Sequence, residues 1–284
     1  MGHHYVPQEY LRGFEDPDSP GKIWMYDKYS HRFAHACIIS VVQEAGYYSE
    51  DTERQLSALI EGPAHKVLKK LRRGDSVNDN DRLRLALYIA TMLMRVPRRR
   101  RKAFEMLPGV LEDVIKRATL TITQWAQTSM VDPALKLKRF AELERAREKL
   151  RAQPPEEVVK KIRAPWPSEK VLACVIGMTW RIASAGDAGF FLTSDNPAFF
   201  FEDYGLGRPE SELIFPLASE LALLGSWQGA PNETIFVKAK PSLMKEVNRR
   251  IASGAERFVF YHACEDWVAR VAEKRDPHLS RIKW

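Results

Sequence analysis

The sequence predicts an α+β protein in which a helical middle region packs beside a mainly antiparallel sheet. Apolar residues recur at helical spacing between residues 51 and 185. Short apolar runs separated by turn residues follow between residues 186 and 284. A hairpin pattern lies near the N-terminus, and its strands are candidates to join the C-terminal sheet. We predict a single domain over residues 1–284, with a mixed segment 1–50, a helical region 51–185 and a β-rich region 186–284.

The N-terminal hairpin and the first helix follow from local patterns. Residues 22–26 and 32–36 flank a polar turn, which is typical of two antiparallel strands. Residues 51–73 place their apolar side chains on one helical face, with Asp51 as the expected N-cap. Gly62-Pro63 interrupts this run, so we expect either a kink or two helices there.

The helical region continues with four more predicted helices. They cover about 80–107, where Pro97 bends or ends the helix, about 109–130, a charged stretch from Asp132-Pro133 to about 151, and a stretch from the cap Ser168 to about 185. Prolines at 154–155 and 165–167 make the best candidate boundary. Strands are then expected at about 189–193, 198–201, 213–215, 221–224, 233–237 and 256–261, and helices at 241–255 and 265–274.

The positive charge of the chain is concentrated in one segment. The net charge is +7, but residues 66–102 hold 13 lysines and arginines against three aspartates, a local balance of +10. Charge of this density attracts nucleic acid or other anions. We therefore expect segment 66–102 to be a candidate nucleic-acid contact, with Arg98, Arg99, Arg100 and Arg101 as anion-binding residues. The simpler interpretation of the arginine run is a solvated helix end.

Several protein classes are excluded by what the sequence lacks. It has no long apolar run that predicts a transmembrane helix and no signal-peptide pattern at its start, so we expect a cytoplasmic protein. Its three cysteines form no CxxC pair, which argues against a disulfide framework and a zinc finger. Phosphate-binding GxxxxGK[ST], HExxH and GxSxG motifs are absent.

Four short segments stand out from the rest of the chain. They are the N-terminal run from His3 to Phe14, Met94-Arg95-Val96-Pro97, Leu192-Thr193-Ser194-Asp195-Asn196-Pro197, and Phe215-Pro216-Leu217. In residue type and order they resemble a bacterial family catalogued as domain of unknown function 4238. The resemblance spans nearly the whole chain. It implies no particular activity.

The residue types in these segments define a candidate site. Histidine acts as acid, base or metal ligand near neutral pH, and arginine binds phosphate or carboxylate in a bidentate manner. The predicted catalytic residues are His3, His4, Asp195 and Asn196; Arg95 is the predicted anion clamp, Gln8 and Tyr10 orient the site, and His4, Glu61 and Asp195 are the candidate ligands of a divalent metal. If this site exists, His3 or His4 lies within about 8 Å of Asp195 or Asn196.

Two functional hypotheses and a structural one stay open. The first is a phosphoester-acting enzyme, a nuclease or nucleotide hydrolase, in a bacterial toxin or phage-defence context. The alternative is a non-catalytic module that binds nucleic acid or protein. In the structural interpretation, Asp195 forms a turn with the backbone before Pro197, the histidines bond a buried turn, and Arg95 neutralises Asp195 as a structural pair.

Overall fold

The computed structural model describes residues 2–45, 47, 49–128, 132–152, 166–274 and 282, except for the side chains of a few of them. The chain forms two compact units. The main unit combines Met1–Arg98 with Pro165–Trp284, and the second unit consists of Arg99–Ala164. This division falls inside the predicted helical region 51–185, because its early helices belong to the main unit. No helix among the described residues has the length and apolar composition needed to cross a membrane.

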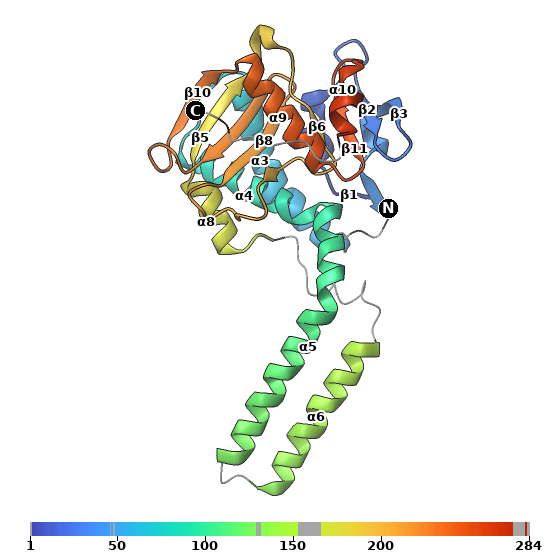
Figure 1. Ribbon diagram of the computed structural model, residues 1–284, viewed down its shortest axis with the longest axis vertical. Helices are drawn as coiled ribbons and strands as arrows, with labels where there is room; N and C mark the ends of the chain where they lie inside the picture. Colours follow the sequence, from blue (N-terminus) through green and yellow to red (C-terminus); the bar gives the residue numbers. More distant parts are fainter. Residues whose placement is uncertain are drawn as a thin grey trace. The chain divides into compact units, whose positions relative to one another are not determined.

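A four-stranded antiparallel sheet joins the two ends of the main unit. The hairpin β2 (Lys22–Asp27) and β3 (Arg32–Cys37) pairs through β2 with β11 (Phe258–Tyr261), which pairs in turn with β6 (Thr193–Ser194). Figure 1 shows the blue N-terminal strands beside the late strand β11. The predicted joining of the N-terminal hairpin to the C-terminal sheet is therefore confirmed.

A second sheet of five strands has the order β10-β5-β9-β8-β7. Its strands are β5 (Thr179–Ser184), β7 (Phe199–Phe200), β8 (Glu212–Ala218), β9 (Leu221–Ser226) and β10 (Thr234–Lys238). The pairs are antiparallel except for β10 with β5, which is parallel. Strand β5 corrects the helix predicted to about residue 185. Helix α8 (Glu169–Gly177) already ends at Gly177, and the apolar run beyond it pairs with β9 and β10.

Short elements complete the N-terminal part of the main unit. Strand β1 (Gly2–His4) pairs antiparallel with β4 (Gln43–Ala45). Between them lie α1 (Gln8–Leu11), the 3-10 turn η1 (Arg12–Phe14), the hairpin and the 3-10 turn η2 (Ile38–Ser40). Tyr10, Leu11 and Phe14 are fully buried in the core, so the N-terminal segment is part of the interior of this unit.

The predicted interruption at Gly62-Pro63 is a π-helical turn. Helix α2 (Glu50–Gln55) passes into the π-turn η3 (Leu56–Glu61) and then into α3 (Gly62–Arg72). The N–H of Gly62 donates to the carbonyl of Ser57, five residues earlier. A Cβ at Gly62 would lie 3.2 Å from that oxygen, which explains the glycine. The N-cap is Ser49 rather than the predicted Asp51, because its hydroxyl accepts the N–H of Thr52.

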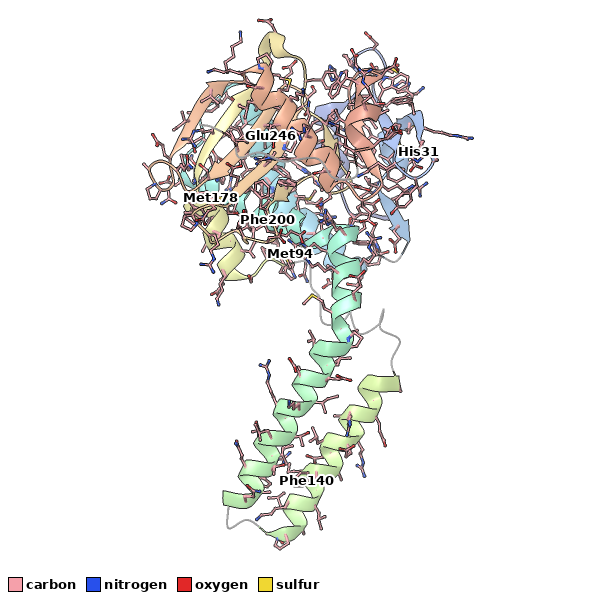
Figure 2. All side chains as sticks on the ribbon, in the orientation of Figure 1. His31, Met94, Phe140, Met178, Phe200 and Glu246 are labelled. Atoms are coloured by element: carbon pink, nitrogen blue, oxygen red, sulfur yellow. The ribbon has the colours of Figure 1, made fainter. Side chains whose placement is uncertain are left out.

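Two further helices begin at capped residues. Ser168, the predicted cap, accepts the N–H of Val171 at the start of α8. Helix α4 (Asp79–Arg95) begins with a capping box between Asn78 and Asp81. The short 3-10 turn η4 (Gly186–Ala188) follows β5. Helices α9 (Pro241–Gly254) and α10 (Trp267–Ala272) lie in the C-terminal part of the chain. Figure 2 labels Glu246 on α9, where it is buried in the main unit.

The second unit is a pair of long helices. Helix α5 (Pro97–Thr128) begins within the last two residues of the main unit. The break between the helices lies at Val96, where Pro97 is predicted to bend or end the helix, and not near residue 108. Helix α5 runs through Pro108 without a break. One proline removes a single hydrogen bond from a helix of 32 residues, and the remaining bonds hold the helix together. Helix α6 (Pro133–Ala152) follows the predicted start at Asp132-Pro133.

Arg82 joins three elements of the main unit. Its buried guanidinium donates to the carbonyls of Ile176 and Met178 at the end of α8. It also donates to the carbonyl of Glu233 and the hydroxyl of Thr234 at the start of β10. The group lies 3.9 Å from the ring centre of Trp180, and burial lowers the pKa of Arg82 to about 10. One arginine of α4 thus donates to four acceptors at the end of α8 and the start of β10.

We predict that Arg82→Lys lowers the free energy of unfolding by about 2–3 kcal/mol, because one ammonium group cannot satisfy all of these acceptors. Urea unfolding measures the loss. Arg84→Lys, at an exposed position of the same helix, is the matched control and should change stability by less than about 0.5 kcal/mol. Equal stability of the two variants would contradict this assignment.

Candidate functional site

Tyr10 joins three of the four segments that stand out in the sequence. Its hydroxyl donates to the carbonyl of Pro216 at 2.8 Å. A phenol has one proton to donate, so the hydroxyl of Thr193, also at 2.8 Å, donates to the Tyr10 oxygen. All of these atoms are buried, and burial raises the pKa of Tyr10. The predicted orienting residue Tyr10 therefore holds the N-terminal segment to the segments at 192–197 and 215–217.

Arg72 strengthens the same junction from α3. Its guanidinium donates to the carbonyl of Leu217 at 2.8 Å and to that of Tyr10 at 3.2 Å. The N–H of Ser219 donates to the carbonyl of Gly13. A Cβ at Gly13 would collide with the guanidinium of Arg72, so this position requires glycine. Two arginines and a tyrosine of the main unit thus satisfy backbone acceptors in its interior.

Arg95 anchors the fourth segment to the first. Its buried guanidinium donates to the carboxylate of Glu61 and to the backbone carbonyl of His4. Tyr47 donates its hydroxyl to the carbonyl of Arg95 at 2.7 Å. Figure 2 labels its neighbour Met94 at the end of α4. Arg95, the predicted anion clamp, binds a carboxylate of the protein itself, that of Glu61.

The imidazole of His4 is held by two neighbours. Its Nε2 lies 3.2 Å from the carbonyl of Ile39. The side-chain amide nitrogen of Gln8, the predicted orienting residue, lies 3.2 Å from the same Nε2 and 3.5 Å from Nδ1. The ring stands at a partly exposed position.

Glu53 on α2 is a titratable group that the sequence did not single out. Burial raises the pKa of its carboxyl, and the charges of Arg95, Glu61, His3 and His4 act on it. Its Oε2 is buried and accepts no hydrogen bond from the described part of the chain. A carboxyl of raised pKa is suited to act as a general acid.

His3 and His65 complete the surroundings of this cluster. His3 is buried, and its Nε2 lies 3.8 Å from the carboxylate of Glu50. His65 stands one turn after Glu61 on α3, and its ring meets Tyr88 edge to face. Burial lowers the pKa of His65, while the charge of Glu61 opposes this shift. We call the set His3, His4, Gln8, Glu53, Glu61, His65 and Arg95 the N-terminal cluster.

Asp195 and Asn196 have backbone partners. The carboxylate of Asp195 accepts the N–H groups of Glu256, Arg257 and Phe258 at 2.7–2.9 Å. Asn196 donates its amide to the carbonyl of Gly254 at 2.8 Å. Both residues thus join the end of α9 to the start of β11. Burial raises the pKa of Asp195 to about 6, although the three N–H groups oppose the shift. Its charge acts on Tyr5, which follows His4 in the chain.

The predicted metal ligands His4, Glu61 and Asp195 are not assembled into one site. Among the residues that the structure describes, no group of three or more His, Cys, Asp or Glu side chains is placed to hold a metal ion. The physical reason lies in their partners. Glu61 binds Arg95, the oxygens of Asp195 bind backbone N–H groups, and Nε2 of His4 faces a carbonyl.

Part of the basic segment 66–102 is engaged with other groups of the protein. Arg72, Arg82 and Arg95 point into the main unit. Four others pair with nearby carboxylates: Lys69 with Glu9, Lys70 with Asp81, Arg73 with Asp75, and Arg98 with Glu202. Of the remaining predicted anion-binding residues, Arg99 is partly exposed, Arg101 is exposed, and the side chain of Arg100 lies outside the described residues. These seven of the 13 basic side chains of the segment thus have partners in the protein.

One known protein family matches most of the chain. A family model described as "Protein of unknown function (DUF4238)" matches residues 2–264. The chain belongs to this family. No curated protein and no solved structure matches it.

The four segments that the DUF4238 resemblance predicted meet around the N-terminal segment of this member. Tyr10, Arg72 and Arg95 make the contacts between them. Glu53 and His65 were not predicted as site residues. A signal for His65 existed, because Glu61 and His65 are four residues apart and so share a helical face. No comparable signal marked Glu53, whose position depends on the π-turn that follows it.

We predict that Tyr10→Phe lowers the free energy of unfolding by about 1–3 kcal/mol, because the carbonyl of Pro216 and the hydroxyl of Thr193 lose a buried partner. Thermal and urea unfolding measure the change. Tyr29→Phe is the matched control, since Tyr29 is 60% exposed. If both variants lost the same stability, Tyr10 would not have the joining role assigned to it.

Proposed function

We propose that this DUF4238 member is a cytoplasmic hydrolase of phosphoesters, with His4 as general base and Glu53 as general acid. One observation carries the proposal. The carboxyl of Glu53 on α2 has a pKa raised by burial, and the charge of His4 on β1 acts on it together with those of Arg95 and Glu61. Pairs of titratable groups in different environments are typical of acid–base active sites.

The local backbone supports this assignment. Glu53 lies in α2, three residues before η3 begins, and Glu61 is the last residue of η3. π-Helical turns occur frequently at functional sites. Arg95 connects Glu61 with the carbonyl of His4, so that the base is held by the same contact that orders the turn. Arg95 and Glu61 therefore act as positioning residues.

The proposed reaction needs only these two side chains and water. His4 takes a proton from the attacking water at Nδ1, and a phosphorus–oxygen bond forms. Glu53 gives its proton to the leaving oxygen as the second phosphorus–oxygen bond breaks. A phosphoester is the favoured substrate because the chain carries a net charge of +7, which attracts anions. A nucleotide or nucleic-acid substrate belongs to this proposal.

We expect Glu53→Gln and His4→Ala each to lower kcat/KM for an activated phosphodiester such as bis(p-nitrophenyl) phosphate by about 10²–10⁴-fold. The pH profile tests the role of Glu53. Activity falls as the pH rises and Glu53 ionises, so Glu53→Gln abolishes this fall. Single-stranded RNA and DNA and nucleoside triphosphates are assayed in parallel to find the substrate class.

Asp51→Asn provides the matched control, because Asp51 lies on α2 with its side chain 67% exposed. It should keep the wild-type rate and profile. A wild-type protein that hydrolyses none of these substrates but binds nucleic acid with a steep salt dependence would contradict the proposal and favour a binding module. Activity that Glu53→Gln and His4→Ala leave unchanged would also contradict it.

A further inference from the structure

A cavity of the main unit shares no residue with the N-terminal cluster. It has a volume of about 540 Å³ and lies between the first turns of α9, the helix α10 and the loop at Gly189-Phe190. Cavities of this size are typical of small-molecule sites. The residues that define its chemistry are Phe190, Met244, Lys245, Glu265, Trp267 and Arg270.

One wall of the cavity is aromatic. The rings of Phe190 and Trp267 lie 5.2 Å apart between centres and are tilted by 43°. The ring of His262 packs against Phe190 with centres 4.5 Å apart and planes at 90°. The side chain of Asn248 accepts the N–H of Leu192 and donates to the carbonyl of Phe190, which fixes the backbone of this wall. The wall is therefore an apolar aromatic face against which a ring can pack.

The lining of the cavity also carries more positive than negative charge. Lys245 and Arg270 line the cavity from exposed positions on α9 and α10, and neither has an ion-pair partner in the described part of the chain. In contrast, most other basic residues near the core of this unit pair with a carboxylate or a carbonyl. Glu265 is the one acidic residue of the lining and offers an acceptor for an amino group. Two such cations beside an aromatic wall match a ligand with a ring and an anionic group.

We propose that this cavity binds a purine mononucleotide. The purine base lies against Phe190 and Trp267, its amino or imino hydrogens face Glu265, and its phosphate binds Lys245 and Arg270. A purine has the larger ring face of the two base types, and stacking on an aromatic side chain grows with the area that it covers. The inference does not rest on the proposed hydrolysis, because it concerns binding at a separate set of residues.

The test is equilibrium binding of AMP and GMP to the full chain, followed by calorimetry and by tryptophan fluorescence. We expect saturable binding, a Trp267→Leu variant that binds at least about 10-fold more weakly, and a similar loss in the double variant Lys245→Gln/Arg270→Gln. Adenosine, which lacks the phosphate, and inorganic phosphate, which lacks the ring, should each bind at least about 10-fold more weakly than AMP.

Lys240→Gln is the matched control, because Lys240 is exposed next to α9 but does not line the cavity. It should bind AMP as the wild type does, whether or not the protein proves to be a hydrolase. Unchanged melting temperatures show that the variants fold. Failure of both AMP and GMP to bind, or binding that the cavity variants leave unchanged, would overturn the proposal. Phosphate binding as tight as AMP binding would overturn it too.

Discussion

The buried contact of Arg95 with Glu61 and the His4 carbonyl is the constraint on which the N-terminal part of this protein depends. A buried arginine needs a carboxylate and further acceptors, because an unpaired charge in the interior costs several kcal/mol. Here η3 supplies the carboxylate and β1 supplies a backbone carbonyl. The contact therefore fixes where β1 runs relative to η3 and the end of α4.

The same principle is repeated across the main unit. Arg72 and Arg82 donate to backbone carbonyls at the ends of strands and helices, and Asp195 accepts three backbone N–H groups at the start of β11. The arrangement of charged groups inside this unit follows from unsatisfied backbone polar groups, which are costly to bury. This explains why a segment with a local balance of +10 becomes core in part, and why residues that look catalytic by type can have a structural place.

Local patterns predicted much of the fold and less of the site. The hairpin at 22–37, the helix starts at Asp132-Pro133 and Ser168 and the short C-terminal strands depend on neighbours in the sequence, so periodicity and turn residues indicate them. Strand β5 escaped prediction because its apolar run continues that of α8, and only pairing with β9 and β10 distinguishes them. The contact of Asp195 with the backbone at the start of β11 and the burial of Glu53 depend on tertiary contacts, which one sequence does not reveal.

Amide hydrogen exchange over residues 2–14 tests most directly whether buried anchors hold the N-terminal segment. The N–H of Tyr5 donates to Val42, and those of Tyr10 and Leu11 donate to Pro7. In the wild type these amides should exchange as slowly as those of β8 and β9, through global unfolding. Arg95→Met should speed exchange at Tyr5 by at least about 10-fold more than at β8 and β9, because it frees β1 locally. Fast exchange of residues 2–14 in the wild type, or equal acceleration throughout the main unit, would contradict this account.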